Sequence, residues 1–291
     1  MQGNKSFLTP APLITVKIAN LRPKVKIFGV PFDSTSTYRT GSRFGPNAIR
    51  EAFMNIEIYS KTLGFDLEHS SIEDLGNIKH TSNVDKMILY ANEATRKILS
   101  DGYIPILLGG EHTLTFAAFD AMPNNTALVI FDAHLDVRNE YDDLKMMHAT
   151  FLRRLIEKHP RVKVVHVGSR AATKEEWRFV ISHKVSLITA DDVLTSENFM
   201  NNLKSVLKDI ESVYVSIDLD VLDPAYAPGV ANPEVCGITM HTLLNVLYHL
   251  RGKDIQGFDI VELCPQYDPS GITAIAAAKL LAELCCLVNL E

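Results

Sequence analysis

Two stretches of the chain carry aspartate and histidine at a spacing that suits metal binding. Asp132, His134 and Asp136 alternate with other residues, and Asp218 and Asp220 repeat this alternation further along. In extended backbone, every second side chain lies on the same side of the chain. Chance would place a D-x-H-x-D sequence in a chain of this composition only roughly 0.04 times. The spacing therefore indicates a built metal site, although a single D-x-D pair would not.

His112 completes the candidate ligand set. It follows Gly109 and Gly110, which allow the backbone to turn tightly. Four carboxylates cannot share one buried place unless cations neutralise them, and two divalent ions would supply the matching charge. Oxygen and nitrogen ligands without a thiolate favour Mn²⁺ over a structural Zn²⁺. A site with two such ions lowers the pKa of a bridging water to roughly neutral and yields hydroxide.

The candidate residues follow predicted strands. Short β-branched runs predict strands at 25–30, 104–108, 128–131, 162–167, 186–189, 213–217 and 257–261, with a weaker one at 70–75. Helical spacing of apolar residues predicts helices at 87–99, 149–158, 197–210, 239–250 and 272–288. Continuous apolar strands alternating with helices predict a parallel sheet covered on both faces. Ligands of such folds bind beyond the carboxyl ends of the strands, where His112, Asp132, Asp218 and Glu262 stand.

Five blocks of sequence resemble the ureohydrolases, the family of arginases and agmatinases. They occur in family order and span nearly the whole chain. They are Val30–Asp33 with Gly41–Glu51, Gly109–His112, Phe131–Asp136, Ser216–Pro224 with Pro228-Gly229, and Asp259–Glu262.

The resemblance implies a fold, a metal centre and an assembly. The fold would be a three-layer α/β/α domain over residues 1–291 with a mostly parallel sheet of about eight strands. One Mn²⁺ would be held by His112, Asp132, Asp136 and Asp218, and the other by Asp132, His134, Asp218 and Asp220. Asp132 and Asp218 would bridge the two ions. Family members release urea from a guanidino carbon by attack of the bridging hydroxide, and they usually form homotrimers or homohexamers.

The resemblance also implies roles for residues around the ions. Glu262 would bind the guanidinium through two parallel hydrogen bonds, and His148 would shuttle protons at the rim of the site. Asp136 would be a catalytic residue together with Glu262 and His148. Asn232 lies where relatives carry a threonine near the guanidino group. The sequence assigns no role to Arg138, Glu140 or Glu234.

The expected substrate is agmatine, cleaved to putrescine and urea in a step of polyamine biosynthesis. The polar residues that follow the D-x-H-x-D motif in arginases are absent, and the run Arg138–Tyr141 with His148-Ala149-Thr150 is agmatinase-like. The run Val230-Ala231-Asn232 departs from the usual agmatinase loop, so guanidinobutyrate, arginine and formiminoglutamate stay open. A deacetylase of acetylated polyamines is less favoured, because the chain has no His-His pair and keeps both aspartates of the second ion. A non-catalytic relative would have lost a ligand, and an amidohydrolase barrel would need an H-x-H motif.

Composition limits the remaining possibilities. The chain has 291 residues, 46% of them hydrophobic, and a net charge of −6, which excludes a disordered chain. No basic run suggests nucleic acid, and the apolar stretch 272–290 contains charged residues, so it predicts a buried helix rather than a membrane span. The four cysteines have no C-x-x-C spacing and are expected to be reduced, which favours a cytoplasmic protein. His166 is expected to be a core residue with a satisfied hydrogen bond, and Asp223 either orients a ligand or caps a turn.

Overall fold

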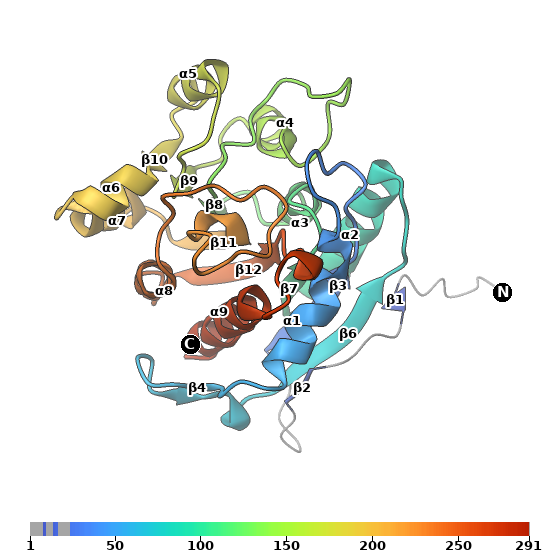
Figure 1. The fold of residues 1–291 in the computed structure, drawn as a ribbon. Helices are drawn as coiled ribbons and strands as arrows, with labels where there is room; N and C mark the ends of the chain where they lie inside the picture. The colour runs from blue at the N-terminus through green and yellow to red at the C-terminus, as the bar shows by residue number, and fades with distance from the viewer. Residues whose placement is uncertain (1–7, 10–13, 17–23, 291) are drawn as a thin grey trace.

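A single large sheet organises the chain in the computed structural model, which describes residues 8–9, 14–16 and 24–290 (Figure 1). The strand order is β1-β6-β3-β7-β12-β11-β8-β9-β10, and β2 also pairs with β6. Its ten strands are β1 (Leu8–Thr9), β2 (Thr15–Val16), β3 (Val25–Val30), β6 (Ile72–Ile78), β7 (Ile104–Gly109), β8 (Ala127–Phe131), β9 (Val164–Val167), β10 (Ser186–Ile188), β11 (Ser212–Asp218) and β12 (Asp254–Val261).

Eight of these strands run parallel, as the sequence predicts. The two exceptions are the short strands β1 and β2, which pair antiparallel with β6 at the edge. All seven predicted strands and the weaker eighth are present, with ends that shift by a few residues. The antiparallel strands have two residues each, so they are too short to show a period in the sequence.

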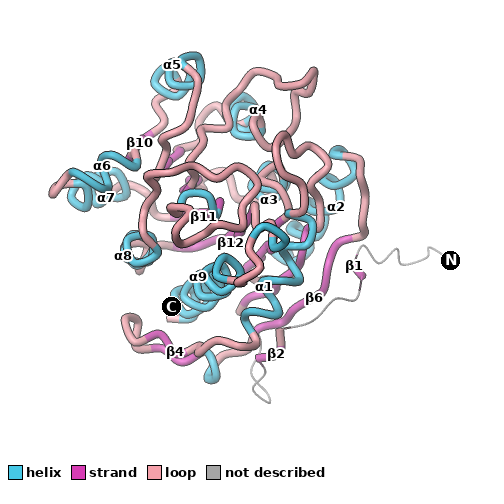
Figure 2. Tube along the Cα trace, viewed as in Figure 1, coloured by secondary structure: helices cyan, strands magenta, loops and turns pink. Residues whose placement is uncertain are grey.

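Helices cover both faces of the sheet, so the three-layer prediction is confirmed (Figure 2). One core contains residues of α1, α6, α7, α8 and α9, and the other contains residues of α2, α3, α4 and α5. The helices are α1 (Gly45–Phe53), α2 (Val84–Ser100), α3 (Leu114–Phe119), α4 (Phe151–Lys158), α5 (Lys174–Ser182), α6 (Ala190–Thr195), α7 (Phe199–Leu207), α8 (Met240–Tyr248) and α9 (Ile272–Asn289). Short elements complete the fold, namely the hairpin β4 (Tyr59–Ser60) and β5 (Phe65–Asp66) and the 3₁₀ helices η1 (Ser42–Phe44), η2 (Leu67–His69), η3 (Leu219–Val221) and η4 (Pro265–Tyr267).

Strand β8 shows why the apolar runs form strands of this kind. Val129 and Phe131 pack into one core, whereas Leu128 and Ile130 pack into the other. Because successive side chains of a strand point to opposite faces, a strand buried on both sides must be apolar throughout. The continuous apolar runs that predicted a parallel sheet are therefore explained by burial of these strands on both faces.

Four helices have no counterpart among the predicted elements. Helix α3 is buried at all six of its positions, so it has no polar face and no helical period to detect. Helix α5 begins with a capping box, in which Thr173 and Glu176 exchange side-chain and backbone hydrogen bonds. The T-x-x-E spacing was a usable sequence signal for that helix. The other two, α1 and α6, are short elements of nine and six residues.

Helix α9 is the apolar C-terminal stretch. It is long and apolar enough to cross a membrane by length and composition alone. However, 78% of its 18-residue window is buried inside the structure. It packs beside α1 and α8, which explains its apolar composition by burial in the protein core.

Candidate metal centre

The strand order brings the predicted ligands to one place. Strands β7, β12, β11 and β8 are neighbours in the sheet, although they are far apart in the chain. His112 follows β7, Asp132 follows β8 and Asp218 ends β11. Glu262 follows β12, the strand between β7 and β11. The carboxyl ends of four adjacent parallel strands thus supply the site.

Local hydrogen bonds explain the spacing of the acidic residues. One carboxylate oxygen of Asp132 accepts a hydrogen bond from the backbone N–H of His134 at 2.6 Å. Asp218 accepts the equivalent bond from Asp220 at 2.8 Å. Such turns leave the second carboxylate oxygen free to face the site. Residues 132–136 are not one extended strand: residue 133 lies in a bend, His134 forms a parallel β-bridge with Ala171, and Asp136 has a φ of 50°. The expected extended backbone therefore does not continue through Asp136.

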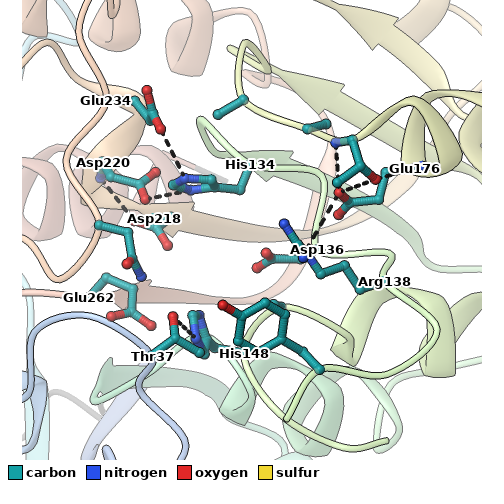
Figure 3. Close-up of a pocket in the computed structure, with 16 residues that line it drawn as sticks. Thr37, His134, Asp136, Arg138, His148, Glu176, Asp218, Asp220, Glu234 and Glu262 are labelled. Atoms are coloured by element: carbon teal, nitrogen blue, oxygen red, sulfur yellow. Dashed lines mark hydrogen bonds and ion pairs between the residues drawn. The ribbon is translucent and has the colours of Figure 1, made fainter.

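Two groups of ligand atoms converge on the floor of the site. Figure 3 shows four of the candidate ligands, His134, Asp136, Asp218 and Asp220. In the first group, Nδ1 of His112 lies 3.1 Å from Asp132, 3.4 Å from Asp136 and 3.3 Å from Asp218. In the second, Nδ1 of His134 lies 2.9 Å from an oxygen of Asp220 and 3.7 Å from one of Asp132. Asp132 belongs to both groups, which is the arrangement expected of a bridging residue.

The electrostatics of the floor fit divalent cations. Nδ1 of His112 and Oδ2 of Asp132 are buried and form no hydrogen bond, although they lie close together. Burial and the charge of Asp132 raise the pKa of Asp136 to about 7. Burial and the charge of Asp220 raise the pKa of Asp218 well above its usual value. Carboxylates that resist ionisation beside one another are stabilised when cations share their oxygens.

A chain of buried hydrogen bonds orients His112. Ser216 donates its hydroxyl hydrogen to Asp259 at 2.6 Å, so it must accept from Nε2 of His112, which lies 2.9 Å away. The Asp259 carboxylate also accepts from Tyr214 and Thr115. Nε2 therefore carries a hydrogen, and Nδ1 faces the three aspartates. Metal-binding histidines are commonly fixed in this way.

Glu262 holds a carboxylate at the base of the pocket. Its Oε1 accepts the backbone N–H of His112 at 2.8 Å, whereas its buried Oε2 has no partner among the described residues. Burial and the charge of Glu111 raise the pKa of Glu262 well above its usual value. The residue also has a φ of 66°, an unfavourable backbone conformation for a non-glycine residue. An unpartnered oxygen and local strain are typical of a functional group.

His148 lies against a loop that sequence reasoning did not assign. Its Nε2 is 3.2 Å from the hydroxyl of Thr37, and its backbone N–H donates to Thr35 at 3.4 Å. Thr35 in turn is held by the buried carboxylate of Glu111, which accepts from its N–H at 2.8 Å. Burial, followed by the nearby histidines of the metal groups, lowers the pKa of His148 to about 4. His148 is thus uncharged at neutral pH and able to accept a proton.

These groups line a pocket of about 380 Å³. Its outer wall contains Arg138, which lies 3.7 Å from the carboxylate of Glu176 and over the ring of Tyr141. Asn232 and Glu234 also line the pocket. Glu234 lies on the side opposite Arg138 and comes within 3.8 Å of Nε2 of His134 (Figure 3). Four of the six candidate ligands, namely His134, Asp136, Asp218 and Asp220, line the pocket together with the proposed substrate-binding residues Glu262 and Asn232. His112 and Asp132 do not line it, but each lies within 3.7 Å of one of these four ligands.

The structure also places four other features named in the sequence analysis: His166, Asp223, Glu140 and the cysteines. His166 is buried as expected, and the backbone of His134 lies close to its ring, although neither ring nitrogen forms a hydrogen bond of regular geometry with a described residue. Asp223 accepts the backbone N–H groups of Ala225 and Gly237, which makes it a turn residue. Glu140 is exposed and does not line the pocket. The four cysteines are free, and three of them are buried.

Comparisons with known proteins agree with this site. A model of the arginase family matches residues 23–286. An agmatinase of Bacillus anthracis is 36% identical over 90% of this chain and 90% of its own length. The mitochondrial guanidino acid hydrolase of Homo sapiens is 32% identical over 89% of this chain and 76% of its own length. The crystal structure of an agmatine ureohydrolase of Thermoplasma volcanium has 38% identity and a TM-score of 0.86, covering 92% of this chain and 90% of that one.

The chain belongs to the arginase family. It is an agmatinase-like ureohydrolase, an enzyme that acts on guanidino compounds.

Proposed function

We propose that the protein is a binuclear manganese enzyme that hydrolyses agmatine to putrescine and urea. The observation that carries the proposal is the pairing of two overlapping Asp/His groups with the free carboxylate oxygen of Glu262 in one pocket. The first ion would contact His112, Asp132, Asp136 and Asp218. The second would contact Asp132, His134, Asp218 and Asp220. When bound, two such ions lower the pKa of a water molecule and supply a nucleophile at neutral pH.

The side chains have distinct tasks in this proposal. Glu262 binds the guanidinium and holds its carbon over the metal groups, because a carboxylate pairs with two parallel N–H donors. His148 is neutral and stands at the edge of the same pocket, so it can take up a proton and deliver it to the leaving amine as the C–N bond breaks. Thr37 holds the ring of His148 in place through its hydroxyl.

The outer wall favours a cationic tail. Beyond the metal groups and Glu262, its charged members are the carboxylates of Glu176 and Glu234 and the guanidinium of Arg138. Two negative charges against one positive charge favour the ammonium group of agmatine over an uncharged or anionic tail. Asn232 adds an amide that can both donate and accept a hydrogen bond near the substrate.

A substrate panel tests the proposal. Purified protein is assayed with agmatine, arginine, guanidinobutyrate and formiminoglutamate, with added Mn²⁺ and after chelation. We expect urea from agmatine at the highest kcat/KM and none after chelation. Arginine turned over tens of times faster than agmatine would overturn the choice of substrate. No product from any of the four with metal bound would overturn the assignment of the site chemistry.

A guanidino acid is the second candidate substrate. Arg138 has 38% of its side chain exposed and lines the pocket, so it offers a cation to a carboxylate tail. An Arg138→Gln variant separates the candidates. If the tail is a carboxylate, the variant loses roughly 10-fold or more in kcat/KM, as expected for a charge-assisted bond. If the tail is an ammonium, kcat/KM stays constant or rises.

The wider setting is proposed on the family resemblance. We propose a cytoplasmic homotrimer or homohexamer built from single-domain subunits. The single sheet shared by ten strands supports one domain. Light scattering coupled to size-exclusion chromatography measures the assembly, and a mass of one subunit of 32.4 kDa would contradict it.

A further inference from the structure

Arg170 makes an unusual set of contacts beside the proposed metal centre. Its guanidinium donates to the backbone carbonyls of Asp220 at 2.7 Å, Val221 at 3.1 Å and Glu234 at 2.9 Å. It also reaches three more carbonyls, those of Gly168, Leu222 and Val235, within 3.4 Å. None of the ion pairs among the described residues includes Arg170, so its hydrogen bonds go to backbone oxygens.

Five of these six carbonyls belong to two loops with different roles in the site. Residues 218–222 carry Asp218 and Asp220 of the metal groups. Residues 232–235 carry Asn232 and Glu234 of the pocket wall. A planar guanidinium has five donors in a rigid fork, so one side chain can fix both loops at a defined separation.

The backbone of Arg170 adds a third loop. The N–H groups of Arg170 and Ala171 both donate to the carbonyl of Ala133, at 2.9 and 3.0 Å. Ala133 lies between Asp132 and His134, which share the second metal group with Asp220. His112 and Asp136, which would bind only the first ion, form no hydrogen bond or ion pair with Arg170 among the described residues.

We propose that Arg170 is a positioning residue that joins the second metal group to the substrate-binding wall. It holds the Asp220 loop against the loop of Asn232 and Glu234, so it sets both the affinity of the second ion and the width of the pocket. The expected effect on the pocket and on KM rests on the proposed function. The expected effect on the affinity of the second ion does not, because it is measured without substrate.

The charge of Arg170 and its positioning role predict opposite effects of its replacement on the affinity of the second ion. A positive charge near a cation site weakens cation binding, so removing that charge would by itself strengthen it. A positioning role predicts weaker binding when the fork is lost. Arg170→Met removes charge and fork together, whereas Arg170→Lys keeps the charge and loses the fork.

The experiment titrates Mn²⁺ into metal-free protein by calorimetry and counts bound ions after dialysis. For both variants we expect one tight ion as in the wild type, and a second ion weakened roughly 10- to 100-fold, the range found when supporting partners of ligands are lost. Electron paramagnetic resonance of Mn²⁺ should then change from a coupled pair to an isolated ion. At saturating Mn²⁺, KM should rise by a larger factor than kcat falls.

Arg153→Met is the matched control, because Arg153 is a partly buried arginine that pairs with Glu157 and Glu175, and none of these three residues lines the pocket. It should bind two ions as the wild type does. Unchanged affinity for both ions in the two Arg170 variants would overturn the proposal, and so would tighter binding in Arg170→Met with no change in Arg170→Lys. If Arg170→Met does not fold, the lysine variant decides alone. Absence of urea from the wild-type enzyme would refute the proposed function and leave the metal titration interpretable.

Discussion

Three residues of this site each have a buried polar atom that forms no hydrogen bond with the described residues. Oε2 of Glu262, Nδ1 of His112 and Oδ2 of Asp132 are all buried without a hydrogen bond. Buried polar atoms of native proteins normally have partners, and leaving one unpaired costs roughly 1–3 kcal/mol. The cost is recovered when a ligand supplies the missing contact. Glu262 faces the pocket and suits a guanidinium, whereas the other two atoms suit a cation.

Replacing Glu262 tests the guanidinium contact. The Glu262→Gln change keeps an oxygen for the His112 N–H but removes the negative charge, so we expect kcat/KM to fall roughly 10- to 100-fold, as for a charge-assisted bond. Steady-state kinetics measures the effect, and metal analysis should still find the wild-type content. An unchanged kcat/KM at full metal content would contradict the contact.

Replacing His148 tests the proton shuttle. In His148→Asn we expect kcat to fall roughly 100-fold or more, the usual contribution of general acid–base catalysis, while metal content stays constant. His241→Asn, on the exposed face of α8, is the control and should retain activity. Equal losses of metal and turnover would show that His148 supports the metal groups instead.

At the level of elements, the sheet supports the site through contacts between strands. Ser216 on β11 and Asp259 on β12 occupy paired positions of adjacent strands. Their hydrogen bond therefore follows from register, and it reaches His112 beyond the end of β7. A hydrogen bond across two central strands is rigid, so the orientation of His112 is fixed before any ion arrives.

Removing the Ser216 hydroxyl tests this orientation. In Ser216→Ala we expect Mn²⁺ affinity to fall roughly 10-fold or more, because the proton of His112 is no longer held on Nε2. Ser212→Ala is a matched control on the same strand, since Ser212 is also buried and its hydroxyl has no partner. Calorimetric titration gives both affinities. The same affinity in the two variants would count against the hydrogen-bond chain.

For the whole molecule, buried histidines link folding to pH. Burial lowers the pKa of both His148 and His166 to about 4. As the pH falls below about 6.5, the unfolded chain takes up these protons and the folded chain does not. Their contribution to the free energy of unfolding is therefore present above pH 6.5 and is lost between pH 6.5 and 4.

Replacing His166 tests this linkage. A difference of about 2.5 pKa units corresponds to about 3 kcal/mol over this range. We expect His166→Phe to lose less stability than the wild type between pH 6.5 and 4.5, because one of the two groups is gone. Urea unfolding in the presence of a chelator measures the free energy of unfolding of the metal-free protein. Release of metal ions at low pH then does not contribute to the curves. His241→Gln is the control, and parallel curves for the wild type and His166→Phe would contradict the linkage.

Much of the site could be predicted from the sequence because its chemistry is local. The D-x-H-x-D and D-x-D spacings are set by turns that involve neighbouring residues, as at Asp132 and Asp218. The position of these residues after apolar runs was enough to place them at the ends of strands. The types of ligand and the charge of the set followed from the residues alone.

The tertiary structure decided which distant groups support them. Ser216 and Asp259 meet because β11 pairs with β12, and Thr37 meets His148 from a loop 111 residues away. Arg170 reaches carbonyl groups 50 to 65 residues away, and a backbone carbonyl has no sequence signature. The physical reason is that strand order and loop packing, set by burial over the whole chain, determine these partners. The sequence by itself was enough to predict the candidate ligands, and the fold determined which groups hold these residues in position.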